Sequence, residues 1–447
     1  MLRSLTRYMS ERRGPQPDIA ADRKLTLFAI GDGQSTHVMT RVRCFAELGH
    51  RVFLITGRRS PNGIEGVTEL RPVEETGCLQ GMFFRLLAWG SYRIAKCPIG
   101  DAWQIIPLVR MLRQHRPDIV HVHYAYNYYG WLVALLGCRP LVVTVMGGDV
   151  LFEEQGSPTR LGKWLTLELL RKADYITSKS NHLTQVLDRL GGFGAKAERI
   201  VWGVRVSQFR RVDATELRAS LGLGGARRII FSPKILQPFY RVHLIVEAMT
   251  MVVRRCPEAV LLIAEYAADP DYKAELVRRV DALGLAGHVI FCGSIGHSTM
   301  PLFYSLAELC VSVPSSDGLP QTLLESMACE TPSILSRLPR YEELVTHEES
   351  AYFVDANPDG IADGIVRLLD DPGLRARIAE TALDIVRRDG DLDVQARRVE
   401  HRYRELAATI RPRVLSVSGL FSTWKSYRRF RKGGTEMDAQ RWPVTSA

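Results

Sequence analysis

LCVSVPSSDGLPQTLLESMACETPSILS, residues 309–336, contains a strand, a polar loop, a helix and a second strand in that order. The runs LCVSVP (309–314) and PSILS (332–336) are short and apolar, as buried strands are, and residues 321–329 carry a helical pattern. Pro320 suits the first turn of that helix. Parallel strands need a crossover between them, so the stretch predicts one unit of a parallel sheet.

The same alternation extends from this stretch through both halves of the chain. In the first half, the runs that predict strands are LTLFAI (25–30), VFLIT (52–56), DIVHVH (118–123), LVVTVM (141–146) and DYIT (174–177). In the second half they are RRIIFSP (227–233), AVLLIAE (259–265), HVIFCG (288–293) and the two runs quoted above. Near-continuous apolar strands separated by helical patterns indicate parallel sheets that are covered on both faces.

The pattern restarts after a glycine-containing junction at residues 203–226, which predicts two domains. The expected fold class is α/β, with two doubly wound, Rossmann-like domains facing across a cleft. Ligands of such sheets bind at the carboxyl ends of the strands. We expect five parts: a flexible N-terminal arm (1–23), a first domain (24–205), a second domain (206–390), a C-terminal helix that packs back on the first domain (391–410) and a basic tail (411–447).

The composition is that of a soluble globular protein. The chain has 447 residues, of which 46% are hydrophobic and 24% charged. No run reaches the ~18 apolar residues of a membrane-spanning helix, and the first residues lack the apolar core of a signal peptide. We therefore expect a cytoplasmic protein. The eight cysteines form no C-x-x-C pair, so we expect neither a zinc site nor a disulfide framework.

The net charge of +10 favours acidic partners such as phosphates, anionic lipid or nucleic acid. Residues 411–432 alone carry seven cations and no acid. The segments 414–432 and 81–116 mix cations with aromatic and aliphatic residues, as an interfacial helix on anionic lipid does. Ordinary core helices followed by a disordered tail would have the same composition. No motif that reads RNA or DNA is present, so we expect no nucleic-acid partner.

The polar loop of the opening stretch places two acids beside a helix N-terminus. Asp317 lies in the loop, and Glu325 lies about one turn into the helix. Backbone N–H groups between them are available to an anion, while the two carboxylates accept hydrogen bonds from hydroxyl groups. This arrangement suits a sugar nucleotide, bound by the two acids together with Gly318, Leu319, Pro320, Gln321 and Thr322. In the alternative, Asp317 caps the helix and the dipole stabilises Glu325.

A second candidate loop follows the first strand of the second half. Ser232 and Lys234 lie at the end of that strand, and Tyr240 and Arg241 stand where the next helix begins. Two cations at a strand end beside a helix N-terminus favour a bound diphosphate. Solvated surface charge is the alternative for both cations.

Two glycine-containing loops follow strands of the first half. Gly31 and Gly33 let backbone amides approach a ligand closely, although a tight turn would use the same glycines. Gly148 and Asp149 follow the strand LVVTVM, where Asp149 either contacts a ligand or caps a helix.

Two histidines alternate on the strand DIVHVH and share one face. His123 is nearer the end of the strand and is expected to line the cleft. His121 and His123 would suit a metal ion only with an acidic or cysteine cluster nearby, and the sequence offers none. We therefore expect no metal site.

Together these motifs resemble the retaining glycosyltransferases of the GT-B fold, specifically glycosyltransferase family 4, over residues 25–408. The most specific part is the acid-x7-acid signature from Asp317 to Glu325, followed by SMACETPSI. The stretches AELGHRV (46–52), PDIVHVHY (117–124), VTVMGGDV (143–150) and EELV (342–345) also match the family. The chain departs from the usual family pattern at Met146, Arg205 and Glu330.

The resemblance implies an enzyme that moves a sugar from a nucleoside-diphosphate sugar to a saccharide or lipid-linked acceptor. It implies retention at the anomeric carbon, and no protein nucleophile, cofactor or essential divalent ion. It places the acceptor in residues 24–205 and the donor in residues 206–390, and it suggests cell-envelope or extracellular polysaccharide biosynthesis. An anionic membrane surface at the inner face of the cell membrane is then a further expected partner.

The resemblance also implies roles for single residues. The second acid of the family holds the ribose and the first contacts the donor sugar, while a basic pair binds the diphosphate. The expected catalytic residues are therefore Lys234, Arg241, Asp317 and Glu325. Gly33, Ser232 and Tyr240 join the donor site, and His123, Gly148 and Asp149 form the acceptor side.

Other functions remain open at this point. A nucleotide-sugar epimerase of the same fold would need no acceptor, and a catalytically impaired family member would transfer nothing. A nicotinamide dehydrogenase is disfavoured because no G-x-G-x-x-G follows a strand; Thr36 stands where the third glycine would be.

Overall fold

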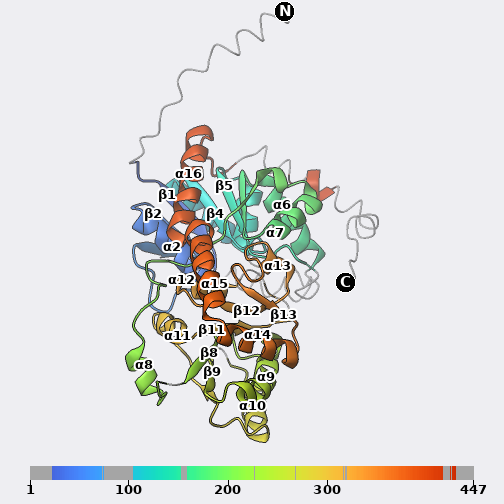
Figure 1. Ribbon diagram of the computed structural model, residues 1–447. Helices are drawn as coiled ribbons and strands as arrows, with labels where there is room; N and C mark the ends of the chain where they lie inside the picture. The colour runs from blue at the N-terminus through green and yellow to red at the C-terminus, as the bar shows by residue number, and fades with distance from the viewer. Residues whose placement is uncertain are drawn as a thin grey trace, which may run out of the picture. The chain divides into compact units, whose positions relative to one another are not determined.

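The computed structural model divides into two compact units. Unit 1 comprises the residues up to Ile200 and those from Ala396, and unit 2 comprises Val201–Gln395. The structure describes residues 23–72, 74, 104–152, 159–225, 227–266, 268–315, 317, 320–415, 423 and 425–428. Apart from Arg23, the expected arm (1–23) lies outside the described residues, as does most of the expected basic tail. Figure 1 shows the elements of both units.

Unit 1 contains a seven-stranded parallel sheet in the order β3-β2-β1-β4-β5-β6-β7. Its strands are β1 (Thr26–Ile30), β2 (Arg51–Ile55), β3 (Val67–Leu70), β4 (Ile119–His123), β5 (Leu141–Val145), β6 (Tyr175–Ser178) and β7 (Ala197–Arg199). Its helices are α2 (Thr36–Glu47), α4 (Ile105–His115), α5 (Tyr128–Leu136), α6 (Arg160–Lys172), α7 (Asn181–Gly191) and the short η2 (Gly194–Lys196). The five strands that the apolar runs predict are confirmed.

Unit 2 repeats this plan with a six-stranded parallel sheet in the order β10-β9-β8-β11-β12-β13. Its strands are β8 (Arg228–Ser232), β9 (Ala259–Ile263), β10 (Val289–Phe291), β11 (Leu309–Ser312), β12 (Ser333–Ser336) and β13 (Tyr352–Val354). Its helices are α8 (Thr215–Ser220), η3 (Pro238–Tyr240), α9 (Val242–Arg255), α10 (Pro270–Ala282), α11 (Met300–Leu306), α12 (Gln321–Ala328), α13 (Pro339–Glu342), α14 (Pro358–Asp370), α15 (Pro372–Ile385) and η4 (Val386–Gly390). Residues 309–336 contain β11, α12 and β12, which confirms the predicted strand, helix and second strand.

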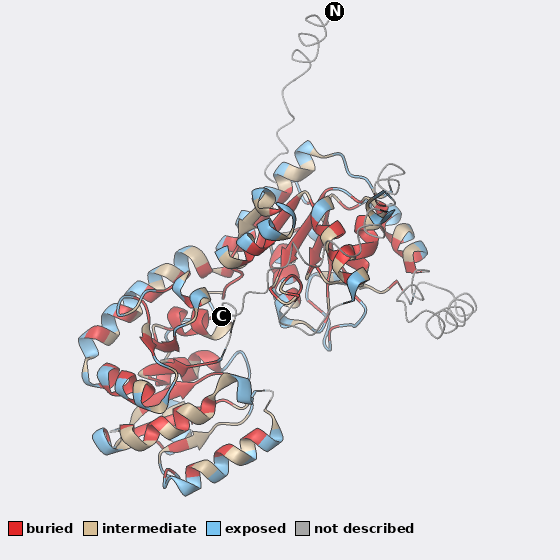
Figure 2. Ribbon diagram, turned by 90° about the vertical axis from the view of Figure 1, so that its right-hand side faces the viewer, coloured by how far each residue is buried: buried red, intermediate tan, exposed pale blue. Residues whose placement is uncertain are grey.

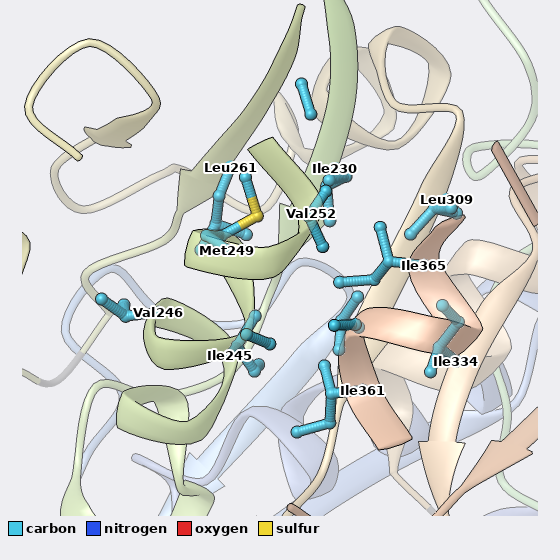
Figure 3. Close-up of a cluster of buried hydrophobic side chains, with 14 of the residues drawn as sticks. Ile230, Ile245, Val246, Met249, Val252, Leu261, Leu309, Ile334, Ile361 and Ile365 are labelled. Atoms are coloured by element: carbon cyan, nitrogen blue, oxygen red, sulfur yellow. The ribbon is translucent and has the colours of Figure 1, made fainter. Parts of the chain in front are cut away.

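Alternation along each strand builds two cores in unit 2. On β8, Ile230 faces α9 and α14, while Ile229 and Phe231 face the opposite core, which contains residues of α11, α12 and α15. Figure 3 shows Ile230 beside Val252 of α9, in the same cluster as Met249 of α9 and Ile365 of α14. The inner strands are buried in both units, while the edge strands β3, β7 and β10 are partly exposed and the outer surfaces of the helices carry most of the exposed residues (Figure 2). Both sheets are therefore covered on both faces.

The chain enters and leaves unit 2 through two paired segments. The Val204 N–H donates to the Gly390 carbonyl at 2.9 Å, and the Leu392 N–H donates back to the Val204 carbonyl at 2.9 Å. The neighbouring Gly203 admits no side chain, because a Cβ there would lie 1.6 Å from the Gly390 oxygen. After Leu392 the chain continues as α16 (Leu392–Thr409), whose later residues belong to unit 1.

Residues of α16 and of the chain beyond it pack within unit 1. Tyr403 of α16 is fully buried and its hydroxyl hydrogen-bonds His121 of β4. Further on, Arg413 forms two backbone hydrogen bonds with Arg139. Thr423 is buried, and its hydroxyl lies 3.4 Å from the Glu168 carboxylate of α6. Part of the expected basic tail is therefore docked on α6. In the part of the chain that the structure describes, no helix combines the length and apolar character needed to cross a membrane.

Candidate functional site

The strand orders locate the candidate site in unit 2. β8 lies in the middle of the sheet with β9 on one side and β11 on the other, so the connections after β8 and β11 run to opposite faces. Ligands of open parallel sheets bind at the carboxyl ends of the strands where this reversal occurs. Lys234 follows β8 and Asp317 follows β11. Two of the predicted catalytic residues thus flank the switch point.

Lys234 and Asp317 form an ion pair at this point. The Lys234 Nζ lies 2.5 Å from Asp317 Oδ2, and the two side chains are 6% and 17% exposed. A nearly buried ammonium is stable only beside an anion, because desolvation costs several kcal/mol. The Lys234 ammonium also lies over the Tyr240 ring, 5.4 Å from its centroid. Predicted donor-site residues from two distant loops are therefore brought together.

A second layer of contacts fixes Asp317. The Tyr341 hydroxyl of α13 donates to Asp317 Oδ2 at 3.0 Å, and Arg340 donates to its backbone carbonyl at 3.1 Å. The loop of Asp317 is also tied to the loop after β8, because the Ser315 N–H donates to the Phe239 carbonyl at 3.1 Å. These bonds hold the acid in place without a ligand.

Glu325 lies on α12 and is buried at 4% exposure. The buried Tyr304 hydroxyl of α11 donates to its Oε2 at 2.8 Å, and His297 Nε2 lies 3.3 Å from its Oε1. The His297 side chain is 71% exposed, and its ring lies against that of the buried Phe209, with centroids 5.0 Å apart. Its hydrogen bond with Glu325 raises the pKa of His297 above the usual 6.5. One oxygen of Glu325 therefore contacts a buried hydroxyl, and the other contacts an exposed imidazole.

The remaining predicted donor residues divide into three groups. Ser232 and Thr322 have buried hydroxyls with no hydrogen-bond partner among the described residues, and such groups in a native structure call for a water or ligand partner. The Gln321 amide donates to the Gly203 carbonyl at 2.7 Å, at the junction between units, and Pro320 is the N-cap of α12. Gly318 and Leu319 lie outside the described residues.

Arg241 is the N-cap of α9, with a positive φ of 52°. Its side chain forms no hydrogen bond or ion pair with any residue in the described ranges, in contrast to Lys234. A side chain held by nothing else remains available to an anionic ligand. The two predicted cations thus differ, since only Lys234 is already paired with an acid.

The carboxyl edge of the unit 1 sheet has its own switch point, between β1 and β4. Gly33 follows β1, and its N–H donates to the Thr56 hydroxyl at 2.9 Å. A Cβ on Gly33 would lie 2.4 Å from the Arg58 carbonyl oxygen, so only glycine fits there. The N–H of Gly33 therefore holds this turn together.

His123 ends β4 and is 1% exposed, and neither of its ring nitrogens has a hydrogen-bond partner within the described part of the chain. Burial lowers the pKa of His123 well below 6.5, so the ring is neutral and offers one donor and one acceptor. The ring of its neighbour His121 lies against it, with centroids 3.9 Å apart and the planes tilted by 38°, and hydrogen-bonds the hydroxyls of Tyr403 and Thr144. Since both His121 nitrogens are occupied, a metal shared by the two histidines is disfavoured.

Asp149 is fully buried, and its carboxylate is used inside unit 1. It accepts hydrogen bonds from the backbone N–H groups of Ala125, Met146 and Gly147, at 2.6, 2.9 and 2.9 Å. Asp149 therefore fastens the loop after β4 to the loop after β5, a third role beside the two that the sequence left open. Gly148 lies in the same turn, and the positive φ there belongs to Gly147, at 124°.

A hollow of about 900 Å³ opens elsewhere in unit 2, beside the starts of β11 and β12. Its lining includes Arg211, Glu308, Glu330 and Arg375, and none of the predicted donor residues. The ion pair and the unpartnered hydroxyls of the predicted site lie instead at the opposite, carboxyl edge of the sheet.

Sequence reasoning missed Tyr304, Tyr341 and His297. Tyr304 and Tyr341 lie 21 and 24 residues from the acids that they contact. No periodicity or motif links residues at such separations. Tyr341 directly precedes the EELV segment that resembles the family, which was the one available signal.

Comparison with known proteins identifies the family. The family model described as "Glycosyltransferase Family 4" matches residues 31–208, and the one described as "Glycosyl transferases group 1" matches residues 213–384. The chain is 23% identical over 345 residues to N-acetyl-alpha-D-glucosaminyl L-malate synthase of Bacillus anthracis, covering 76% of this chain and 85% of that protein. It is 25% identical over 244 residues to the lipopolysaccharide core biosynthesis mannosyltransferase LpsB of Rhizobium meliloti, covering 53% of this chain and 67% of that protein.

The fold is similar to that of Anabaena Alr3699/HepE, which was solved in complex with UDP-glucose. The TM-score is 0.65 at 16% identity, and the superposition covers 86% of this chain and 100% of that one. The two family models match successive parts of the chain; the first contains the strands of the seven-stranded sheet apart from β1, and the second contains the whole six-stranded sheet. The chain belongs to the family 4, group 1 glycosyltransferases and has the GT-B fold.

Proposed function

We propose that the protein transfers a hexose, with retention, from a nucleoside-diphosphate sugar to a saccharide or lipid-linked acceptor of the cell envelope or of an extracellular polysaccharide. The observation that carries this proposal is the Lys234–Asp317 ion pair at the β8/β11 switch point, with Glu325 on the helix that follows. The similarity to the mannosyltransferase LpsB supports an envelope saccharide as acceptor.

The chemistry follows from the charge that develops during transfer. When the glycosidic bond of the donor breaks, negative charge grows on the leaving diphosphate and positive charge on the sugar ring. The Lys234 ammonium and the Arg241 guanidinium stabilise the diphosphate. An incoming phosphate competes with Asp317 for Lys234, which frees the Asp317 carboxylate for hydroxyls of the sugar. The leaving phosphate can accept the proton of the acceptor hydroxyl, so no protein nucleophile is needed.

Glu325 and the buried hydroxyls complete the donor site in this proposal. A ribose hydroxyl replaces the exposed His297 as the hydrogen-bond partner of Glu325 Oε1. The buried Ser232 and Thr322 hydroxyls form hydrogen bonds with the phosphates or the sugar. On the acceptor side, the neutral His123 ring can accept a hydrogen bond from the attacking hydroxyl. Asp149 then supports that side by holding its loops.

A binding screen followed by a transfer assay tests the proposal. Full-length protein is melted in the presence of UDP-, GDP- and ADP-sugars, since a donor that binds the native fold raises the melting temperature. The donor that stabilises is then incubated with and without an acceptor extract. We expect sugar transfer only with acceptor. Conversion of the nucleotide sugar without acceptor would instead establish an epimerase, and absence of any stabilising donor would contradict the proposal.

We further propose that unit 1 meets an anionic membrane surface. On α4, Ile106 is 58% exposed, and Arg110 and Arg113 are exposed with it. Residues 104–116 contain no acid. Apolar and basic side chains on one outer surface fit the interface of an anionic bilayer. The rest of the segment 81–116 lies outside the described residues.

Point substitutions test this surface better than deletion of the tail. Removing residues after 410 would expose Glu168 and Trp164, which contact Thr423, Ser426 and Tyr427. We therefore expect Arg110→Glu/Arg113→Glu to reduce flotation with vesicles containing anionic lipid at moderate salt. The control is Arg254→Glu/Arg255→Glu on α9 of unit 2. Equal flotation of both variants and wild type, or none by wild type, would contradict the proposal.

A further inference from the structure

Each acid of the candidate donor site is held by a tyrosine hydroxyl from outside the acid-x7-acid signature. Tyr304 donates to Glu325 Oε2 at 2.8 Å, and Tyr341 donates to Asp317 Oδ2 at 3.0 Å. Both tyrosines are fully buried. The two contacts have the same form although they come from different helices, α11 and α13.

The two phenols act only as donors to these acids. Burial raises the pKa of Tyr304 and of Tyr341 well above the usual value, and the neighbouring carboxylates raise it further. Each hydroxyl therefore keeps its proton at physiological pH. Because a carboxylate has about four lone-pair directions, each acid can accept one tyrosine hydroxyl and still bind a ligand.

The tyrosine rings are anchored by packing that does not depend on the acids. The Tyr304 ring makes an edge contact with Phe231 of β8, with centroids 5.5 Å apart. Both tyrosines also belong to the buried core on that face of the sheet. Phenylalanine would fill the same apolar space, so the hydroxyls are what distinguish tyrosine at these two positions.

We propose that Tyr304 and Tyr341 are positioning residues of the donor site. Tyr304 turns the Glu325 carboxylate toward the ribose, and Tyr341 turns the Asp317 carboxylate toward the hexose. This inference rests on the proposed function, which assigns the ribose to Glu325 and the hexose to Asp317. It adds that one tyrosine orients the acid that binds the ribose and a different tyrosine orients the acid that binds the hexose.

The two roles predict different binding defects. A hydrogen bond to a charged group that is lost should weaken binding about tenfold or more. Tyr304→Phe should weaken UDP and UDP-glucose to the same extent. Tyr341→Phe should leave UDP unchanged and weaken UDP-glucose, and it should lower kcat. A general loosening of the fold would weaken both ligands in both variants.

Titration calorimetry on the full chain tests this separation, with UDP and UDP-glucose as probes and GDP and GDP-mannose in parallel. The matched control is Tyr272→Phe, a buried tyrosine of α10 whose hydroxyl accepts from the His243 N–H at 3.0 Å. It touches neither acid and should bind like wild type. A double-mutant cycle adds a second readout: in a Glu325→Ala background, Tyr304→Phe should have no further effect on UDP affinity.

The outcomes separate this inference from the proposed function. If wild type binds none of the four probes, nor ADP or ADP-glucose, the proposed function fails and this inference with it. If wild type binds and both phenylalanine variants bind equally well, the positioning roles are refuted while the function stands. An additive effect in the Glu325→Ala background would also refute them. So would a phenylalanine variant that does not fold, because its hydroxyl would then be structural.

Discussion

Replacing Lys234 by alanine should cost both stability and turnover, for two separable reasons. The substitution removes the ammonium that lies 2.5 Å from Asp317 Oδ2. The Asp317 side chain is only 17% exposed, so water cannot replace the lost cation fully. The Tyr341 hydroxyl remains as a donor to that oxygen.

The magnitudes follow from these contacts. Breaking a buried ion pair by removing one partner costs ~3–5 kcal/mol. The remaining tyrosine bond and partial exposure place Lys234→Ala near the low end, about 3 kcal/mol in the free energy of unfolding. Loss of a charge that stabilises the leaving diphosphate should lower the rate ~100-fold.

Adding Asp317→Asn to Lys234→Ala separates the two effects. The double variant has no buried unpaired charge, so most of the stability should return, while turnover stays low. Unfolding in urea measures the first effect and sugar transfer the second. Lys196→Ala is the control, because it also deletes an ammonium, a half-buried one that donates to two backbone carbonyls in unit 1 and lies away from the predicted site. Wild-type turnover by Lys234→Ala would refute the role of the ammonium, and unchanged unfolding would refute the account of the pair.

Three further predictions concern single residues. Glu330 follows α12 with a φ of 56°, a backbone conformation that favours glycine. Glu330→Gly should therefore raise the free energy of unfolding in urea by about 0.5–1 kcal/mol. A gain of the same size in Glu330→Ala would contradict this explanation. Asp149→Ala leaves three buried N–H groups without an acceptor and should destabilise the protein by about 3 kcal/mol in urea, whereas a loss under 1 kcal/mol would mean that water replaces the carboxylate. The pKa of His297 is raised, so its ion pair with Glu325 is fully formed below the unfolded pKa of 6.5 and is lost as pH rises through the folded pKa. Because the His297 imidazolium and the nucleotide compete for Glu325, nucleotide affinity should increase with pH across this window. In His297→Gln the affinity should not change with pH, and a pH dependence that persists in this variant would contradict the competition.

The strands of both sheets were predictable where burial is complete. DIVHVH (118–123) contains β4, whose five residues are all buried. Three of them are apolar and two are histidines, and this mainly apolar run is what made the strand predictable. β3, β7 and β13 were missed. β3 and β7 are half-exposed edge strands that carry Thr68, Glu69, Glu198 and Arg199, and β13 is an edge strand of only three residues. An edge strand buries too little surface to need an apolar run.

The candidate site was predictable in its acids and cation but not in its supports. The loop spacing and the family resemblance both pointed to Asp317, Glu325 and Lys234, and the structure joins Lys234 to Asp317. The role of Asp149 was not predictable, because carboxylates that bind a ligand and those that bind backbone amides occur in the same turn sequences. A hydroxyl such as that of Tyr304 acquires its partner only when the chain has folded.

The most direct test of the account is a crystal structure of the full chain with the nucleoside diphosphate that stabilises it most. We predict that the diphosphate contacts Lys234 and that the ribose hydroxyls lie within hydrogen-bonding distance of Glu325, with His297 displaced. A nucleotide seated at the carboxyl edge of the unit 1 sheet, or one that leaves the Lys234–Asp317 and His297–Glu325 pairs intact, would contradict it.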